Sequence, residues 1–406
     1  MKTVVVGAGA SGLVCAYFCK LQGDEQVVLI EKNEKLGKKL YITGKGRCNL
    51  TNDCDEEKFL SNVVSNPKFL MSAIYGFSPK NVIDFFTNLG LPLKTERGNR
   101  VFPVSDKSSD VIKTLSKALT DVGVEIRLNE TVLAIEQQDG YVKGVKTDKE
   151  YILADKVVVA TGGMSYPQTG STGDGYKFAK ILGHNVTDLK PSLCGIELVG
   201  DDYKNLQGLT LKNVCLNAYD GKKNYYSEQG EMLFTHYGVS GPLVLTCSAL
   251  TTRRDLKNIK LSIDLKPALS FEELNARVLR DFSININKEI KNSLDMLLPK
   301  ALIPLIIKRA NIPFDKKCNL ISKEERLNLV KTLKNLDFIV KNLRPFDEAV
   351  ITSGGVSVKE INPKNMESKL VKGLYFIGEV LDVDAFTGGF NLQIAFSTGY
   401  TAGQNA

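Results

Sequence analysis

Hydrophobic positions near the start of the chain fall into runs that predict a strand, a helix and a second strand. Val4 to Val6 form a continuous apolar run, residues 13–21 have helical spacing, and residues 26–30 form a second apolar run. A short and wholly apolar run is typical of a parallel strand, because both faces of such a sheet are covered. The chain is therefore expected to open with a β-α-β unit that ends at Glu31.

The same patterns predict further elements of an α/β domain. After a loop at 37–52, which is too glycine-rich and basic for a regular element, we expect helices over 78–89 and 106–122. Strands are expected over 123–127, 131–137 and 156–160, with a hairpin arm at 140–146.

The pattern of apolar and turn residues changes near Pro191. Short strands at 194–198, 214–219 and 259–265 are separated by turn residues, and Asp220-Gly221 marks a hairpin, so we predict a small antiparallel sheet or barrel. Helices are then expected over 271–282, 288–298, 301–310 and 323–333, followed by a strand over 338–343. We then expect a buried strand at 372–380 and a glycine turn that opens a helix at 388–396, a pattern like that at the start of the chain. The simplest arrangement is one nucleotide-binding domain split by insertions.

Composition limits the class of protein. The 406 residues allow two or three domains, and no run approaches eighteen apolar residues, so no membrane segment is expected. The first strand begins at Lys2, which leaves no room for a signal peptide, and we expect a cytoplasmic protein. Eight cysteines and two histidines show no metal-ligand spacing, so we expect free thiols and no metal site.

The glycines after the first strand indicate a dinucleotide site. Gly7 permits the tight turn, Gly9 lets a pyrophosphate approach the backbone, and Gly12 lets the helix pack on the strand. The helix N-terminus then faces the phosphates. Glu31 ends the second strand, where an acidic residue accepts hydrogen bonds from a ribose diol. The alternative is an ordinary tight strand–helix turn.

A second glycine turn near the C-terminus favours a flavin. Gly388, Gly389 and Asn391 open a helix whose positive end would stabilise negative charge on the pyrimidine edge of a reduced flavin ring. The glycines of 169–175 do not follow a βαβ unit of their own, so a second dinucleotide site is not expected.

Six segments resemble the bacterial BaiN/RdsA family of FAD-dependent oxidoreductases, and together they span nearly the whole chain. They are residues 7–12, 42–52 (Ile-Thr-Gly-Lys-Gly-Arg-Cys-Asn-Leu-Thr-Asn), 160–175, 230–242, 351–356 and the pair 378–382 and 387–393. The family includes a ribosomal-RNA dihydrouridine synthase, a bile-acid enone reductase and aminoacetone-oxidase-like flavoproteins. The resemblance implies bound FAD and three regions: a Rossmann-type FAD-binding domain at 1–190 and 348–406, an antiparallel β-barrel substrate domain at 191–268 and 335–347, and a basic helical domain at 269–334 inserted within the barrel.

The resemblance also implies site residues. It places Glu31 on the adenosine ribose, the Val132 backbone near the adenine, and Glu379 at the ribityl chain. Two departures from the family pattern are Lys45 within the flavin loop and Ala385-Phe386 after Asp384. The full set expected to bind the cofactor is Gly7, Gly9, Ala10, Ser11, Gly12, Glu31, Lys32, Thr43, Gly44, Arg47, Cys48, Asn49, Val132, Thr161, Gly162, Gly378, Glu379, Gly388, Gly389, Asn391 and Leu392.

Reduction of an activated C=C requires a proton donor beside the flavin. Cys48 is one candidate, because the adjacent Arg47 is expected to lower its pKa; the alternative is a packed thiol. His236 and Tyr237 are candidates on a loop that could face the flavin, with structural turn packing as the alternative, and Tyr166 is a weaker one.

Positive charge gathers in one part of the chain. Residues 251–350 contain twenty Lys and Arg against thirteen Asp and Glu, which accounts for the whole net charge of +7. This excess suggests ribosomal RNA or its precursor as partner, against the alternative of a solvated helical surface. The pairs expected on phosphates are Arg253 with Arg254, Lys308 with Arg309, and Lys316 with Lys317.

Three functions compete. The first is reduction of uridine in large-subunit ribosomal RNA to dihydrouridine, with NAD(P)H as transient electron donor. The second is a small-molecule flavoenzyme, either an enone reductase or an amine oxidase. The third is a non-catalytic, flavin-stabilised ribosome-binding factor. The sequence indicates neither the oligomeric state nor the choice between NADH and NADPH.

Overall fold

A five-stranded parallel sheet forms the centre of one of the two units into which the computed structural model, residues 1–406, divides. Unit 1 comprises Met1–Ser192 and Pro345–Ala406, and unit 2 comprises Leu193–Arg344. The strands of the sheet, in spatial order, are β19 (Leu374–Phe376), β10 (Lys156–Val159), β1 (Lys2–Val6), β2 (Gln26–Glu31) and β6 (Glu125–Leu128).

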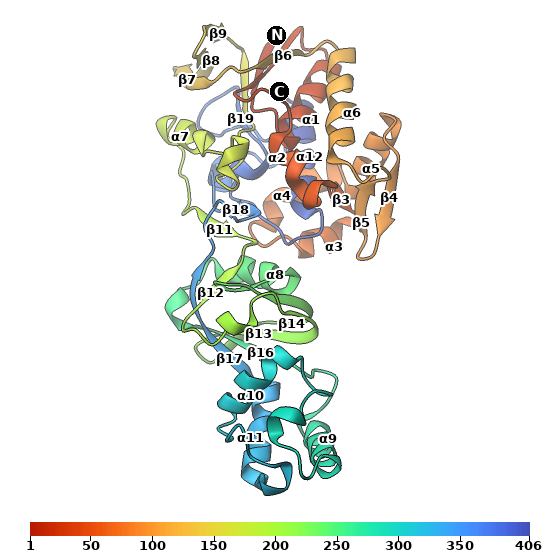
Figure 1. Ribbon diagram of the computed structural model, residues 1–406. Helices are drawn as coiled ribbons and strands as arrows, with labels where there is room; N and C mark the ends of the chain where they lie inside the picture. The colour runs from red at the N-terminus through yellow and green to blue at the C-terminus, as the bar shows by residue number, and fades with distance from the viewer. The chain divides into compact units, whose positions relative to one another are not determined.

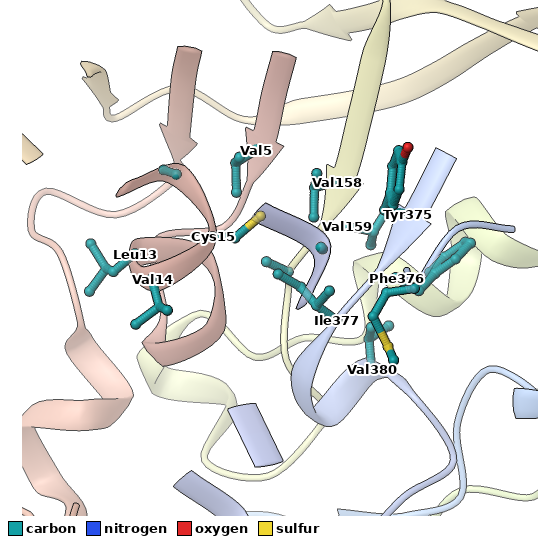
Figure 2. Packing of buried hydrophobic residues seen from close by; sticks show 14 of the residues in the cluster. Val5, Leu13, Val14, Cys15, Val158, Val159, Tyr375, Phe376, Ile377 and Val380 are labelled. Carbon is teal, nitrogen blue, oxygen red and sulfur yellow. The ribbon is translucent and has the colours of Figure 1, made fainter. Parts of the chain in front are cut away.

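Nearly every residue of the inner strands is buried, as their apolar runs predict. Figure 2 shows how side chains of β1, β10 and β19 gather in one cluster with Leu13, Val14 and Cys15 of α1 (Ala10–Leu21). Burial of this kind contributes roughly 1.5–3 kcal/mol for each large apolar side chain. The cluster holds the strand ends that carry the glycine turns.

The two ends of the chain meet in unit 1. Helix α12 (Phe390–Gly403) lies against α1, as Figure 1 shows, because glycines of α12 let the backbones approach closely. A Cβ on Gly399 would lie 2.5 Å from the carbonyl oxygen of Ser11, and one on Gly403 would lie 2.8 Å from that of Cys15. The C-terminal segment is therefore an integral part of the N-terminal fold.

Other helices and small sheets surround this framework. The helices are α2 (Lys38–Ile42), α3 (Glu56–Ser61), α4 (Pro67–Gly76), α5 (Pro79–Asn88), α6 (Ser108–Asp121) and α7 (Asp174–Ile181). The antiparallel sheets consist of β3 (Thr51–Asn52), β5 (Arg100–Pro103) and β4 (Leu93–Glu96); of β7 (Val132–Gln138), β8 (Tyr141–Thr147) and β9 (Tyr151–Leu153); and of β11 (Lys190–Ser192) with β18 (Ile351–Ser353).

Unit 2 contains a closed antiparallel barrel, which confirms the predicted combination of a Rossmann-type sheet with an antiparallel barrel. Its strands, in order around the barrel, are β12 (Ile196–Leu198), β15 (Gly238–Ser240), β14 (Lys223–Phe234), β13 (Thr210–Asp220), β16 (Ile259–Asp264) and β17 (Leu336–Leu343). Helix α8 (Pro242–Thr251) follows β15, and α9 (Phe271–Ile284), α10 (Ile303–Arg309) and α11 (Lys323–Lys334) lie between β16 and β17 in the chain.

Three expected elements differ in the structure. Residues 288–298 form no α-helix, although Ile290 and Leu294 are buried at helical spacing. Residues 288–290 pair with 316–318, as in the bond from the N–H of Ile290 to the carbonyl of Lys316 (2.8 Å), and a short 3-10 turn follows. The loop at 37–52 includes α2 and a short 3-10 turn. The buried run at 372–380 is a strand only over Leu374–Phe376. No helix combines the length and the apolar character that a membrane span requires.

Candidate functional site

The three glycines of the first turn have different surroundings. A Cβ on Gly12 would lie 1.9 Å from the carbonyl oxygen of Gly7, and a Cβ on Gly7, where φ is +103°, would lie 2.6 Å from that of Ala160. A Cβ on Gly9 would meet nothing within 4 Å. Gly7 and Gly12 are therefore required by packing, whereas Gly9 borders open space.

That open space lies at the N-terminus of α1. Gly9 is the N-cap residue and supplies no side-chain cap, so the first N–H groups of the helix, from Ala10 and Ser11 onward, have no side-chain acceptor from it. Uncapped N–H groups and the positive end of the helix dipole together form an anion site. The turn therefore fits the pyrophosphate of a dinucleotide.

Glu31 lies beside this turn at the end of β2. Its Oε2 accepts the N–H of Ala8 (2.9 Å), and its Oε1 accepts the backbone and side-chain N–H groups of Asn33 (2.9 and 2.6 Å). The N–H of Glu130 donates to the carbonyl of Glu31 (3.2 Å), so Val132, the first residue of β7, starts close to the same strand end. The residues expected at the ribose and the adenine are thus brought together.

Lys32 makes a different set of contacts. Its Nζ donates to Thr172 Oγ1 (2.6 Å) and Asp174 Oδ2 (2.7 Å), which ties the end of β2 to the start of α7. Thr161 and Gly162 follow β10, and the Oγ1 of Thr161 is buried without a hydrogen-bond partner. An orphaned polar atom of this kind fits a group that would bind there.

Residues 43–49, the flavin loop, follow α2 in a strained conformation. Gly44, Lys45, Gly46 and Cys48 have φ between +57° and +83°, a region that side chains other than glycine rarely adopt. Lys45 is exposed. Strain of this kind is typical of functional loops, whose surroundings hold them in place. The Oδ1 of Asn49, the last residue of this loop, is buried and has no partner.

Arg47 leaves the loop toward the surface. Its Nε donates to Asp106 (2.8 Å), its guanidinium also pairs with Glu96, and it lies 4.2 Å from the centre of the Phe102 ring. These contacts fasten the flavin loop to the β4–β5 hairpin.

The expectation that Arg47 lowers the pKa of Cys48 is wrong. Burial raises the pKa of the Cys48 thiol to about 12, and only a hydrogen bond with Thr43 opposes this shift. The side chain of Cys48 has no exposed surface, and Thr43 Oγ1 itself donates to the carbonyl of Leu40 (2.7 Å). Desolvation therefore outweighs the effect of a guanidinium that is engaged elsewhere.

Glu379 is at the centre of a polar cluster after β19. Its Oε1 accepts from Ser165 Oγ (2.9 Å) and from the N–H of Thr352 (2.8 Å), and its Oε2 accepts from Lys39 Nζ (2.7 Å). Gly378 precedes it with φ of +72°. The lysine and glutamate side chains are 20% and 21% exposed, so this ion pair lies at the edge of the interior.

Lys39 is the site residue that sequence reasoning missed. It lies on α2, and the N–H of Gly37 just before this helix donates to the carbonyl of Ala8 in the dinucleotide turn (2.9 Å). Lys39 therefore joins the N-terminal turn to the C-terminal Glu379. The sequence places four cations between 38 and 47, and spacing alone does not distinguish this one.

The second glycine turn meets β3, which follows the flavin loop. Gly389 is the N-cap of α12, and a Cβ there would lie 2.4 Å from the backbone of Thr51; the Nδ2 of Asn52 donates to the carbonyl of Gly388 (3.1 Å). The structure thus brings the N-terminus of α12 against Thr51 and Asn52, just after the flavin loop.

Two neighbours of this turn have structural contacts. The side-chain amide of Asn391 bonds the backbone N–H and carbonyl of Ala385 (3.0 and 2.8 Å), so it fixes the loop before α12. Leu392 is partly buried against the core.

His236 and Tyr237 lie in unit 2, between β14 and β15. Their rings are 5.0 Å apart, and the guanidinium of Arg344 lies 4.4 Å from the centre of the Tyr237 ring. His236 is exposed, and Tyr237 packs on Gly195, where a Cβ would lie 2.5 Å from its hydroxyl. Tyr166 is in unit 1, at a residue with φ of +52°, and burial raises its pKa.

Most cations expected on phosphates form ion pairs within unit 2. Lys308 Nζ and Arg309 Nη2 each lie 2.9 Å from Asp202, and Lys316 Nζ lies 2.6 Å from Glu325. Arg254 pairs with Asp220 at 3.3 Å and stacks on Tyr225 at 4.0 Å. Arg253 and Lys317 are exposed, and Lys317 has no acidic partner. Internal pairing weakens the case for Lys308, Arg309 and Lys316 as phosphate contacts.

Known proteins match the whole chain. A family model described as the HI0933-like protein Rossmann domain matches residues 1–405. The chain is 30% identical to the 3-dehydro-bile acid delta(4,6)-reductase of Clostridium scindens, covering 99% of this chain and 98% of that one. It is 32% identical to the ribosomal RNA dihydrouridine synthase of Haemophilus influenzae, covering 98% and 96%. The synthase of the same name from Escherichia coli is 30% identical, covering 99% and 97%.

Among solved structures, the chain resembles a 3-ketosteroid-delta4-(5alpha)-dehydrogenase from Rhodococcus jostii, with a TM-score of 0.53 and 17% identity over 99% of this chain and 95% of that one. At this identity the likeness concerns the fold. The matches confirm the resemblance to the BaiN/RdsA flavoproteins and the expectation of an FAD-dependent oxidoreductase. The chain therefore belongs to the HI0933-like family of Rossmann-fold proteins.

Proposed function

We propose that this protein reduces an activated C=C bond by means of FAD held in unit 1, with NAD(P)H as the transient electron donor. The observation that carries the cofactor assignment is the open space at Gly9, beside the uncapped start of α1 and the carboxylate of Glu31. When bound, FAD supplies a hydride from N5 to the substrate carbon.

The residues of unit 1 divide the work of binding. The first N–H groups of α1 bind the pyrophosphate. Glu31 binds the adenosine ribose, and the Val132 backbone contacts the adenine. Lys39 and Glu379 hold the ribityl side of the cofactor, where their ion pair offers both a cation and acceptor oxygens. The N-terminus of α12 and the strained loop that ends at Asn49 frame the flavin ring, and the helix dipole stabilises negative charge there.

The favoured substrate is uridine in large-subunit ribosomal RNA. Two relatives that match along nearly the whole chain are named ribosomal RNA dihydrouridine synthases. The double bond of uracil is conjugated to a carbonyl, so hydride and proton add to neighbouring carbons. The relative from Clostridium scindens supports a second candidate, a small enone, because its name describes reduction of a bile acid at comparable identity.

Three residues are candidates for the proton donor, Cys48, His236 and Tyr237. Cys48 keeps its proton at neutral pH but has no exposed surface through which to meet a substrate. His236 is exposed on the β14–β15 loop, and Tyr237 beside it carries a hydroxyl. We therefore assign proton donation to this pair in preference to Cys48.

The function is tested by deleting the gene and measuring dihydrouridine in purified ribosomal RNA by nucleoside mass spectrometry. Loss that is restored by the intact gene, and not by a His236→Ala and Tyr237→Phe double variant that retains FAD, supports RNA reduction by this pair. Unchanged dihydrouridine excludes a non-redundant role on RNA. Turnover of a free enone by the purified protein, without an RNA effect, would instead support the second candidate.

A further inference from the structure

Unit 2 contains a second group of cations, separate from the pairs at 253–254, 308–309 and 316–317. Lys222 lies on the turn between β13 and β14, Lys223 is the first residue of β14, and Lys257 lies on the connection from α8 to β16. All three side chains are exposed, and none has an acidic partner. They form no ion pair, unlike Lys308, whose carboxylate partner is Asp202. The carboxylate of Asp255 accepts the backbone N–H of Lys257 (3.2 Å).

The backbone holds these lysines close together. The N–H of Gly221 donates to the carbonyl of Asn258 (3.2 Å), which fastens the hairpin turn to the connection that carries Lys257. Asp220 pairs with both Lys223 and Ile259 in the register of the barrel. Gly221 has φ of +58°, as the Asp-Gly turn requires. Lys223 is thus on a barrel strand, and Lys222 and Lys257 are on turns that the bond from Gly221 to Asn258 joins.

The aromatic rings near the three lysines already contact other cations. The ring of Tyr225 is covered by the guanidinium of Arg254 at 4.0 Å, and that of Tyr219 lies 5.1 Å from Lys260 Nζ. These rings are therefore not expected to stack on bases. Exposed lysines without free aromatic faces suit a phosphate backbone, which is read by charge and not by base identity.

We propose that Lys222, Lys223 and Lys257, the barrel-turn cluster, contact the phosphates of the RNA substrate. This inference rests on the proposed function, since it requires RNA as partner. The contacts are independent of nucleotide sequence, so the choice of uridine is made elsewhere. Each phosphate contact adds about 0.7 to 0.9 to the slope of log affinity against log salt.

The test compares the wild-type holoenzyme with a Lys222→Glu, Lys223→Glu, Lys257→Glu variant. The probe is deproteinised large-subunit ribosomal RNA from the deletion strain, and binding is measured by filter retention between about 50 and 200 mM KCl. The affinity of the wild type should fall between these two salt concentrations. The factor by which it falls should be about 20 to 40 times smaller for the variant, because three phosphate contacts are lost. Flavin absorbance should be unchanged, because the cluster lies outside unit 1.

A matched control carries Lys288→Glu, Lys300→Glu and Lys323→Glu. These lysines are exposed, lack acidic partners and lie in the same unit, so the change in net charge is the same. The control should keep a salt dependence close to that of the wild type. If RNA binding weakens equally in both variants, or does not weaken in the first, the proposed role of the barrel-turn cluster is wrong, and the proposal of RNA reduction is unaffected. Absence of RNA binding by the wild type overturns both proposals.

Discussion

Gly9→Ala is expected to separate cofactor binding from folding. A Cβ at this position meets no atom within 4 Å, and the backbone of Gly9 (φ −82°, ψ −170°) is one that alanine adopts without strain. The same space is the proposed path of the pyrophosphate. The added methyl group should therefore disturb the bound cofactor and leave the protein itself almost unchanged.

Two small and opposing effects act on the stability of the apo protein, and a stronger one acts on cofactor binding. Alanine caps a helix less well than glycine, whereas loss of glycine's freedom in the unfolded chain stabilises by about 0.4–1 kcal/mol, so the free energy of unfolding should change by less than about 1 kcal/mol. A methyl group forced into an occupied space costs about 1–3 kcal/mol. FAD affinity should therefore fall by about 5- to 150-fold.

The assay pairs urea unfolding of the apo protein with FAD titration followed by quenching of flavin fluorescence. Gly76→Ala is the matched control, because Gly76 ends α4 and a Cβ there also meets nothing within 4 Å. The control should bind FAD as the wild type does. If Gly9→Ala also binds FAD with wild-type affinity, the pyrophosphate does not pass over Gly9 and the reasoning fails.

Three further variants test the packing of the same region. Gly12→Ala should destabilise the apo protein by at least about 1–3 kcal/mol, because its Cβ would lie 1.9 Å from the Gly7 carbonyl; wild-type stability in urea would contradict this. Lys39→Gln should lower the free energy of unfolding by about 1–3 kcal/mol, because Glu379 loses its charged donor; an unchanged urea midpoint would rule this out. Folding raises the pKa of Cys48 to about 12 from an unfolded value of about 8.5, so its contribution to stability is complete below about pH 8 and declines as the pH rises toward 12. Cys48→Ala should flatten that decline in pH-dependent urea unfolding, and parallel curves for variant and wild type would refute the assignment.

Local patterns predicted those parts of the fold that depend on near neighbours. The β-α-β unit up to Glu31 has one apolar run for each strand, and the structure has strands at Lys2–Val6 and Gln26–Glu31. The helix predicted over 288–298 is absent because helical spacing describes only which side chains are buried. The backbone of residues 288–290 instead pairs with 316–318, more than twenty residues along the chain.

In the candidate site, too, features set by nearby residues were predictable and features set by distant contacts were not. The glycine turn was visible in the sequence, since each glycine is explained by atoms nearby in the fold. The partnership of Lys39 with Glu379 joins residues 340 positions apart, and only the tertiary structure brings them together. Burial of Cys48 is likewise a property of the packed interior, which an adjacent Arg47 in the sequence does not reveal.

The split of unit 1 has a consequence for biosynthesis. The glycine turn is translated before unit 2, whereas β19 and α12, which complete its sheet and cover α1, are translated after unit 2. Unit 2 is continuous in the chain and can fold while unit 1 is still incomplete, because domains generally fold as units during synthesis. A nascent or prematurely terminated chain therefore exposes the apolar face of α1 and lacks Glu379. We therefore expect the flavin to be acquired only after α12 has been made, so that retention of the cofactor marks a chain that includes α12.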